Sequence, residues 1–214
     1  MKYQICVSGA ASGETVMASN DLAFMLGAEI ARAGKTLLTG ATTGLPHAAA
    51  RGFKSVSNTK GVSVGFSPAS SFREHVSTYR LPTVEFDYIN FTSMEYVGRD
   101  VYLVRSADAV ITIGGRMGSL HEFSTALESR KVCGILVGSG GLADYAAQLL
   151  KNVEAPGAKD VIYDSDPKRL VARVVEALDK KYADFEHDGT DSQVKVLDRK
   201  STRLNSNHAR LSRM

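Results

Sequence analysis

The sequence of 214 residues is poor in cysteine and proline, with two cysteines, five prolines and no tryptophan. Two cysteines are too few for a disulfide framework or a metal-binding knuckle, and both lie in apolar runs where we expect them to be buried and inert. No apolar run approaches the roughly 18 residues that cross a bilayer, and the N-terminal apolar stretch is too short for a signal peptide. We therefore expect a cytoplasmic protein with no membrane partner.

An excess of basic charge is confined to the C-terminal end of the chain. The formal net charge is +3, but residues 198–214 alone contain five basic residues and one acid. The rest of the chain is left with a net charge of −1. A near-neutral body gives no electrostatic footprint for a phosphate backbone, so we expect no nucleic-acid partner.

The same C-terminal residues have no periodic apolar pattern. The run from Ser201 to His208 resembles the translated read-through of sequencing adapters, and a genuine basic disordered arm is the alternative. Residues 182–197 are polar and predict a linker after the last helix. The sequence therefore predicts one folded domain over residues 1–181, followed by the linker and by a basic tail at 198–214.

Short β-branched runs alternate with helical stretches through the folded part of the chain. One helix should end at Gly34, where a residue free to adopt a positive φ is favoured, and another should begin near Asp166 and Pro167. The polar stretch between Pro68 and Pro82 is a candidate for a flexible flap. This alternation predicts an α/β fold of the Rossmann type, doubly wound around a mostly parallel sheet. The expected strands are residues 3–8, 36–39, 61–66, 109–113, 133–137 and 161–163.

Glycine-rich turns follow three of these strands. In doubly wound sheets, ligands bind beyond the carboxyl ends of the strands, where glycine lets the backbone approach closely and the next helix N-terminus attracts a phosphate. A strand-to-helix turn also needs glycine for geometry alone, but three such turns at one sheet edge favour a nucleotide-type anion. The candidate phosphate-binding residues are Gly9, Gly40, Thr43, Gly44, Gly114, Gly115, Gly118 and Ser119.

Several common cofactor signatures are missing from the sequence. The first turn lacks the G-x-G-x-x-G spacing and no acid ends the second strand, which argues against a dinucleotide. The one Gly-Lys-Thr run, at residues 34–36, lacks the earlier glycine of the G-x-x-x-x-G-K-[ST] pattern and leads into an expected strand, which excludes a Walker loop. Three of the histidines, His47, His75 and His187, have no partner at metal-ligand spacing. We expect neither a metal nor a cofactor.

The third glycine-rich turn carries a family resemblance. Residues 114–122 read GGRMGSLHE and resemble the P-G-G-x-G-T-x-x-E signature of the LOG family, phosphoribohydrolases often mislabelled lysine decarboxylases. The resemblance extends over most of residues 3–180. It implies a hydrolase that splits a nucleoside 5′-monophosphate into free base and ribose 5-phosphate, with Glu122 and Arg99 as catalytic residues. Family members commonly dimerise, so a homodimer is also expected.

The sequence departs from that signature at four places. Ile113 replaces the proline, Arg116 and Met117 stand where the family has one residue, Ser119 replaces threonine, and His121 stands where many members have a second acid. Relatives with this fold include carriers of molybdenum cofactor and nucleotide sensors. A protein that binds a nucleotide or a phosphorylated cofactor without turnover is therefore the alternative function.

The two candidate catalytic residues suit the chemistry of N-glycosidic hydrolysis. Breaking the bond develops positive charge on the ribose, which a carboxylate can stabilise while it orients or deprotonates water. An arginine can hold phosphate or ribose oxygens. We assign these roles to Glu122 and Arg99.

Each of these two residues also has a purely structural interpretation. Ser119 and Glu122 fit the S-x-x-E capping box at a helix start. Arg99 lies four residues after Glu95 and could form an exposed ion pair on the helix. The apolar stripe of that helix, drawn through residues 94, 97, 101 and 104, points Arg99 away from the core. The sequence alone leaves both interpretations open.

Overall fold

The computed structural model describes residues 3–183 of the chain. The chain separates into two units, Met1–Leu178 and Asp179–Met214, and the first of them contains the whole sheet. All but the first two residues of the predicted linker, and the whole of the tail at 198–214, lie outside the described residues.

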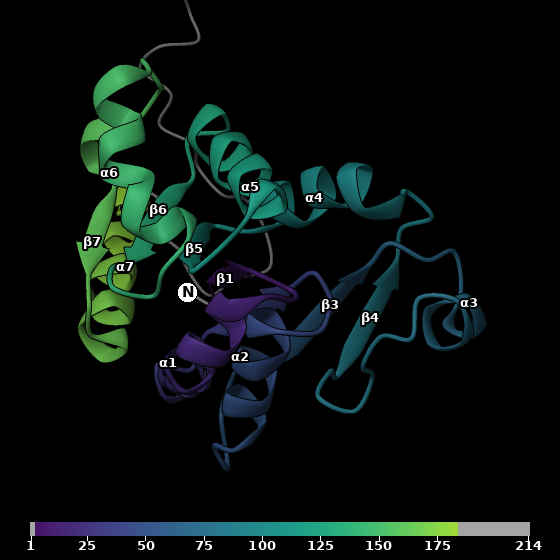
Figure 1. The fold of residues 1–214 in the computed structure, drawn as a ribbon. Helices are drawn as coiled ribbons and strands as arrows, with labels where there is room; N and C mark the ends of the chain where they lie inside the picture. The colour runs from purple at the N-terminus through teal and green to yellow at the C-terminus, as the bar shows by residue number, and fades with distance from the viewer. Residues whose placement is uncertain (1–2, 184–214) are drawn as a thin grey trace, which may run out of the picture. The chain divides into compact units, whose positions relative to one another are not determined.

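Seven strands form one parallel sheet in the order β4-β3-β2-β1-β5-β6-β7. The chain steps outward from β1 to β4, returns through the helix α4 (Glu95–Ser106), and then steps outward the other way from β5 to β7 (Figure 1). The predicted α/β, doubly wound, parallel fold is therefore confirmed. The strands are β1 (Gln4–Gly9), β2 (Thr36–Thr39), β3 (Ser63–Ser67), β4 (Tyr88–Phe91), β5 (Ala109–Ile113), β6 (Val132–Leu136) and β7 (Ile162–Asp164).

Helices cover both faces of this sheet. Figure 1 shows α1 (Glu14–Arg32) and α2 (Leu45–Lys54) on the side of the strands opposite to α4 and α5 (Met117–Glu128). The second face also carries α6 (Leu142–Asn152), since its Ala143 and Ala146 belong to one buried cluster with residues of α4 and α5. The remaining helical elements are α3 (Phe72–Ser77), a 3₁₀ turn at Ala158–Asp160 and α7 (Pro167–Lys181).

Apolar side chains on both sides of the strands explain this double covering. Every residue of β5 is buried, and β1 is buried from Ile5 to Ser8. Such continuous burial is typical of parallel strands between two helical layers. Cys6 and Cys133 are both buried, as predicted. None of the helices described between residues 3 and 183 is long and apolar enough to cross a membrane.

The switch in winding direction fixes where a ligand can bind. β1 lies between β2 and β5, and the connections that leave β1 and β5 run to opposite sides of the sheet. The loops after these strands therefore separate and leave a crevice at the carboxyl edge. All three glycine-rich turns of the sequence follow β1, β2 and β5 and so lie at this edge.

The structure differs from the sequence prediction between residues 68 and 92. The expected flap contains α3, whose first turn is capped by Ser71, and the buried His75 anchors it. The Nδ1 atom of His75 lies 2.8 Å from the Ser67 hydroxyl, and its Nε2 atom lies 3.0 Å from the carbonyl oxygen of Pro82. The segment is therefore attached to the rest of the fold through a buried side chain, and its movement as a flap over the site stays a prediction. The edge strand β4 was also missed, because none of its four residues is buried and Asn90 interrupts its apolar run.

Candidate functional site

A pocket of about 300 Å³ opens at the carboxyl edge of β1, β2 and β5. The backbone after β1 lines it from Gly9 to Ser12, and Gly40 and Thr42 line it after β2. Side chains from α4 and the first turns of α5 complete the wall. The pocket therefore lies at the switch point, where doubly wound folds bind ligands.

Six of the ten candidate residues line this pocket, and four do not. Those that line it come from all three glycine-rich turns, from α4 and from α5: Gly9, Gly40, Arg99, Gly118, Ser119 and Glu122. Those outside the lining are Thr43, Gly44, Gly114 and Gly115.

The four residues outside the lining hold neighbouring backbone segments in place. The N–H of Gly114 donates to the hydroxyl of Ser139 at 2.8 Å, and the carbonyl groups of Gly114 and Gly115 accept from the first N–H groups of α6. Gly44 has φ +74°, and a Cβ there would lie 2.4 Å from the carbonyl oxygen of Ala10. The Thr43 hydroxyl donates to the carbonyl oxygen of Ala11, in the loop that follows β1. These residues shape the loops, and the pocket wall is made by their neighbours.

Arg99 is buried, and its guanidinium lies against the backbone of the turn that follows β2. Its side chain is 5% exposed, and a Cβ on Gly40 would lie 1.6 Å from its Nη1 atom. Nε and Nη1 have no hydrogen-bond partner in the described part of the chain. Nη1 lies 3.9 Å from Oε1 of Glu122, and Nε lies 3.5 Å from Oδ1 of Asp100, so the charges pair without close hydrogen bonds. Buried, unsatisfied donors in a pocket are suited to an anionic ligand.

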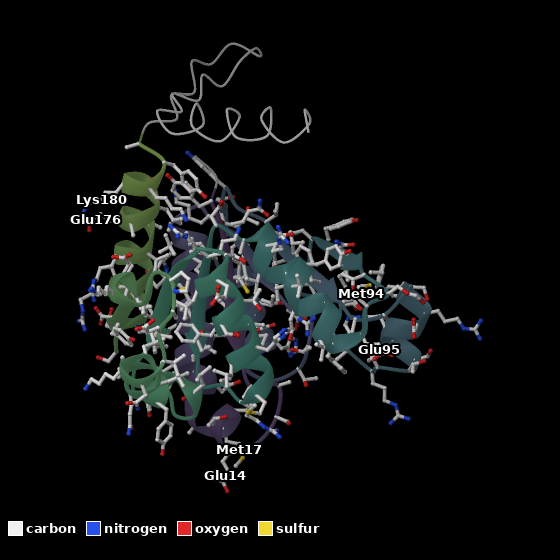
Figure 2. The ribbon with its side chains drawn as sticks, turned by 90° about the horizontal axis from the view of Figure 1, so that it is seen from above. Glu14, Met17, Met94, Glu95, Glu176 and Lys180 are labelled. Carbon is white, nitrogen blue, oxygen red and sulfur yellow. The ribbon has the colours of Figure 1, made fainter. Side chains whose placement is uncertain are left out.

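The structure corrects the predicted orientation of α4. Val97 is 70% exposed. Met94, the first residue of the predicted apolar stripe, is also exposed (labelled in Figure 2). The buried residues of this helix are Arg99, Asp100, Leu103 and Val104. Of the predicted stripe only Val104 is buried, so the predicted apolar face is wrong for its other three residues, and the exposed pair of Arg99 with Glu95 is also wrong. A helix that buries charges against a polar pocket does not show its inner face in an apolar pattern.

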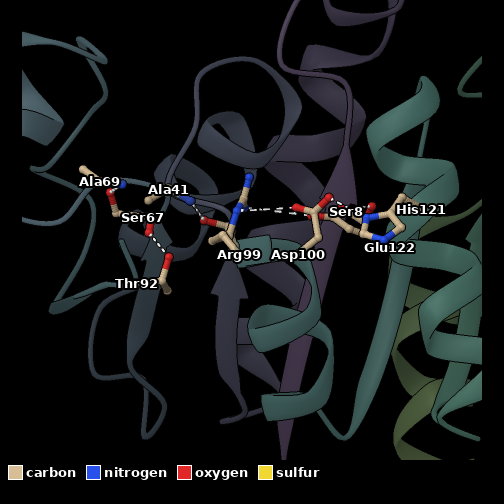
Figure 3. A network of polar contacts seen from close by, with 10 residues as sticks. Ser8, Ala41, Ser67, Ala69, Thr92, Arg99, Asp100, His121 and Glu122 are labelled. Carbon is tan, nitrogen blue, oxygen red and sulfur yellow. Dashed lines mark hydrogen bonds and ion pairs between the residues drawn. The ribbon is translucent and has the colours of Figure 1, made fainter. Parts of the chain in front are cut away.

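Glu122 is not part of a capping box. The helix α5 begins at Met117 with Arg116 as its N-cap residue, so Ser119 already lies inside the helix. The Glu122 carboxylate instead accepts a hydrogen bond from the hydroxyl of Ser8 in β1 (Figure 3). The capping-box interpretation fails because the helix starts three residues earlier than the box requires.

Burial and charge together set the protonation of Glu122. Burial of the carboxyl group raises its pKa from 4.5 to about 7, while the positive charge of Arg99 acts against this rise and the negative charge of Asp100 adds to it. The carboxyl group therefore changes charge close to neutral pH. A carboxylate tuned in this way is suited to accept or release a proton during a reaction.

Two polar residues of this network were missed by sequence reasoning. Asp100 is buried next to Arg99, and its Oδ2 atom lies 3.0 Å from Nδ1 of His121, which does not line the pocket (Figure 3). Ser8 is the one polar side chain within the buried part of β1, a signal that was available but was not used. Residues 3–183 contain no group of three His, Cys, Asp or Glu side chains that could hold a metal ion.

The raised pKa of Glu122 gives an expected dependence of stability on pH. Between pH 4.5 and 7 the folded protein retains a proton that the unfolded chain has released, so unfolding becomes easier as the pH rises through this range. We expect the melting temperature to fall by at least roughly 2–4 °C between pH 5 and pH 8. Glu122→Gln should reduce this fall, because glutamine does not titrate. Thermal denaturation of both proteins at the two pH values measures the difference, and parallel pH profiles would refute it.

Gly40 should matter because it leaves room for Arg99. A methyl group there would displace the guanidinium, whose flexible end can move without unfolding the protein. We expect Gly40→Ala to weaken binding of a nucleoside monophosphate by about tenfold or more, the cost of one charge-assisted hydrogen bond, with little change in melting temperature. The control is Gly98→Ala on α4, where a methyl group meets only the side chain of Met94. Calorimetry that finds the same affinity in both variants would contradict the expectation.

The sequence and the structure were compared with known proteins. A protein-family model described as the SLOG cluster4 family matches residues 2–171. The molybdenum cofactor carrier protein of Chlamydomonas reinhardtii is 24% identical with a TM-score of 0.64, and the alignment covers 83% of this chain and 99% of that one. The molybdenum cofactor binding protein of Rippkaea orientalis is 24% identical with a TM-score of 0.63, covering 83% and 98%.

A third solved structure is more distant. DNA processing protein A from Helicobacter pylori is 14% identical with a TM-score of 0.56, and the alignment covers 82% of this chain and 81% of that one. The search of curated proteins gave no match. At these identities the solved structures show a shared fold and nothing more about activity.

Proposed function

The chain belongs to the SLOG cluster4 family, and we propose that it hydrolyses the N-glycosidic bond of a nucleoside 5′-monophosphate to free base and ribose 5-phosphate. The observation that carries the proposal is the pairing of Arg99 and Glu122 in the pocket. A carboxyl group with a pKa of about 7 lies beside a buried guanidinium that keeps two unsatisfied donors. This is the pair of groups that the LOG resemblance assigns to catalysis.

The start of α5 supports a phosphate site in the same pocket. Met117, Gly118 and Ser119 open the helix and line the pocket. The first N–H groups of a helix have no acceptor within it, and the helix dipole adds positive potential there. A Cβ on Gly118 would meet no heavy atom within 4 Å, so this residue leaves open space in front of the helix. A 5′-phosphate fits this position.

The reaction then follows from the placement of Glu122. A water molecule held by the carboxylate attacks the anomeric carbon of the ribose and gives its proton to Glu122. The bond between ribose and base breaks, and the electron pair leaves with the base nitrogen. The base takes up a proton from solvent and Glu122 releases one to solvent, so the net transfer is of one proton from the attacking water to the base. Arg99 holds ribose or phosphate oxygens so that the bond lies next to the carboxylate. The hydroxyl of Ser8 fixes the orientation of that carboxylate.

A second function uses the same pocket without turnover. The fold similarity to the two proteins that carry or bind molybdenum cofactor favours binding of a phosphorylated cofactor, which would use the start of α5 and Arg99 in the same way. The departures of residues 113–121 from the LOG signature favour the same alternative. The phosphate site is common to both proposals, and only the hydrolysis step separates them.

One assay separates the two functions. The purified protein is incubated with a panel of nucleoside 5′-monophosphates, and free base and ribose 5-phosphate are measured together. Hydrolysis predicts equal amounts of both products, formed in proportion to enzyme. Saturable binding of a monophosphate without any product would reject the hydrolase and support the carrier.

A further inference from the structure

We infer that Tyr96 forms a stacking surface for the planar base of the bound nucleotide. The inference rests on the proposed function, because it assigns the base of the same ligand to one wall of the same pocket. It adds the side chain that recognises the base of that substrate class. It also separates the residue that recognises the base from the residues that act on the bond.

The position of Tyr96 carries the first part of this inference. Tyr96 lines the pocket from α4, one helical turn before Arg99, and its side chain is 46% exposed. A large aromatic side chain in a pocket wall that stays half exposed has apolar surface left to cover. None of the other aromatic residues between positions 3 and 183, the part of the chain that the structure describes, lines this pocket.

Two side chains contact the Tyr96 ring. The ring of Tyr79 packs against it edge to face, with centroids 5.6 Å apart and an interplanar angle of 81°. The Cζ atom of Arg99 lies 6.0 Å from the ring centroid, at the outer limit of a cation–π contact. A ring held by a neighbour is a better stacking surface than a free one, because little side-chain entropy is lost when the ligand binds.

The order of groups along the pocket matches the order of groups in a nucleotide. Arg99 is adjacent to Tyr96 on one side and lies 3.9 Å from Glu122 on the other. Glu122 follows the phosphate-binding turn of α5 by one helical turn. Base, ribose and phosphate can therefore contact Tyr96, the pair of Arg99 and Glu122, and the start of α5 in that sequence. A sugar phosphate without a base would use only the last two.

The test compares ligands with and without a base. Calorimetry is done in the Glu122→Gln background, so that no ligand is hydrolysed, with ribose 5-phosphate and with the monophosphate of the panel that binds most tightly. We expect Tyr96→Leu to weaken monophosphate binding by about tenfold or more, since stacking on an aromatic side chain is worth this much. Ribose 5-phosphate should bind as before, and Tyr96→Phe should keep both affinities.

A matched control and three outcomes decide the question. Tyr102→Leu removes another half-exposed tyrosine of α4 that lies outside the pocket lining, and it should change neither affinity. Equal weakening of both ligands by Tyr96→Leu would show that Tyr96 only supports Arg99, and no weakening would also overturn the inference. Selective weakening by Tyr96→Leu, together with a wild-type protein that releases no base from the panel of monophosphates, would refute the hydrolase and leave the stacking surface intact.

Discussion

Glu122→Gln is expected to lower the rate of base release by about 10² to 10⁴-fold, the range that a positioned acid or base contributes to catalysis. The affinity for the monophosphate should change by less than about threefold, because glutamine keeps the size of the side chain and an oxygen that can accept from Ser8. The loss therefore belongs to the chemical step. Single-turnover rates and calorimetric dissociation constants, measured on the same preparations, separate the two effects.

The dependence of the rate of base release on pH tests the role of Glu122 in a second way. If the carboxylate form of Glu122 acts on water, the rate should rise as the pH passes through about 7, where this group loses its proton. Glu128→Gln at the end of α5 is the matched control, since Glu128 is exposed and lies outside the pocket lining. Unchanged turnover in Glu122→Gln, with a normal rate in the control, would remove Glu122 from the mechanism.

The fold class could be predicted from the sequence because the central strands β1, β2 and β5 are buried on both faces. Continuous apolar runs such as residues 109–113 show a parallel strand directly, and Gly34, with φ +65°, follows α1 as predicted. Pro167 likewise opens α7, where the Asp166 carboxylate accepts from the N–H of Arg169. These signals are local, so no knowledge of the tertiary structure was needed to read them.

The inner face of α4 could not be read in the same way. Burial of Arg99 and Asp100 depends on Gly40 in another turn and on Glu122 in another helix, and no local pattern contains those partners. Val97 fits the apolar stripe predicted for α4, although its side chain faces solvent. Charged residues become buried when long-range partners compensate for desolvation, so a functional site is where an apolar pattern misleads.

The same reasoning explains why glycine positions were only partly informative. Gly40 and Gly118 lie in the pocket wall, while Gly114 and Gly115 hold the loop before α6. All four belong to glycine-rich turns after strands, and a turn needs glycine for its own geometry as often as for a ligand. Only the way in which one loop packs on the next distinguishes a glycine in the pocket wall from a glycine that holds a loop.

Discrimination between a nucleoside monophosphate and its nucleoside should be the largest binding effect at this site. Only the monophosphate has a group to meet the N–H groups of Met117 to Ser119 at the start of α5. Hydrogen bonds to a charged group contribute about 1.5–3 kcal/mol each, so two of them predict a preference of more than about 100-fold for the monophosphate. Calorimetry of the two ligands with the wild-type protein measures this ratio, and equal affinities would overturn the phosphate site.

Gly118→Val should abolish most of this preference without unfolding the protein. Gly118 lies in the first turn of α5, and a Cβ there meets no protein atom, so the valine side chain extends into the space that a phosphate would occupy. The control is Ser124→Val, which places the same β-branched residue on an exposed position of α5. We expect the control to keep the preference and Gly118→Val to bind monophosphate and nucleoside about equally. If Gly118→Val retained the full ratio at an unchanged melting temperature, the phosphate would have to bind elsewhere in the pocket, and Glu122 would lose the group that positions its substrate.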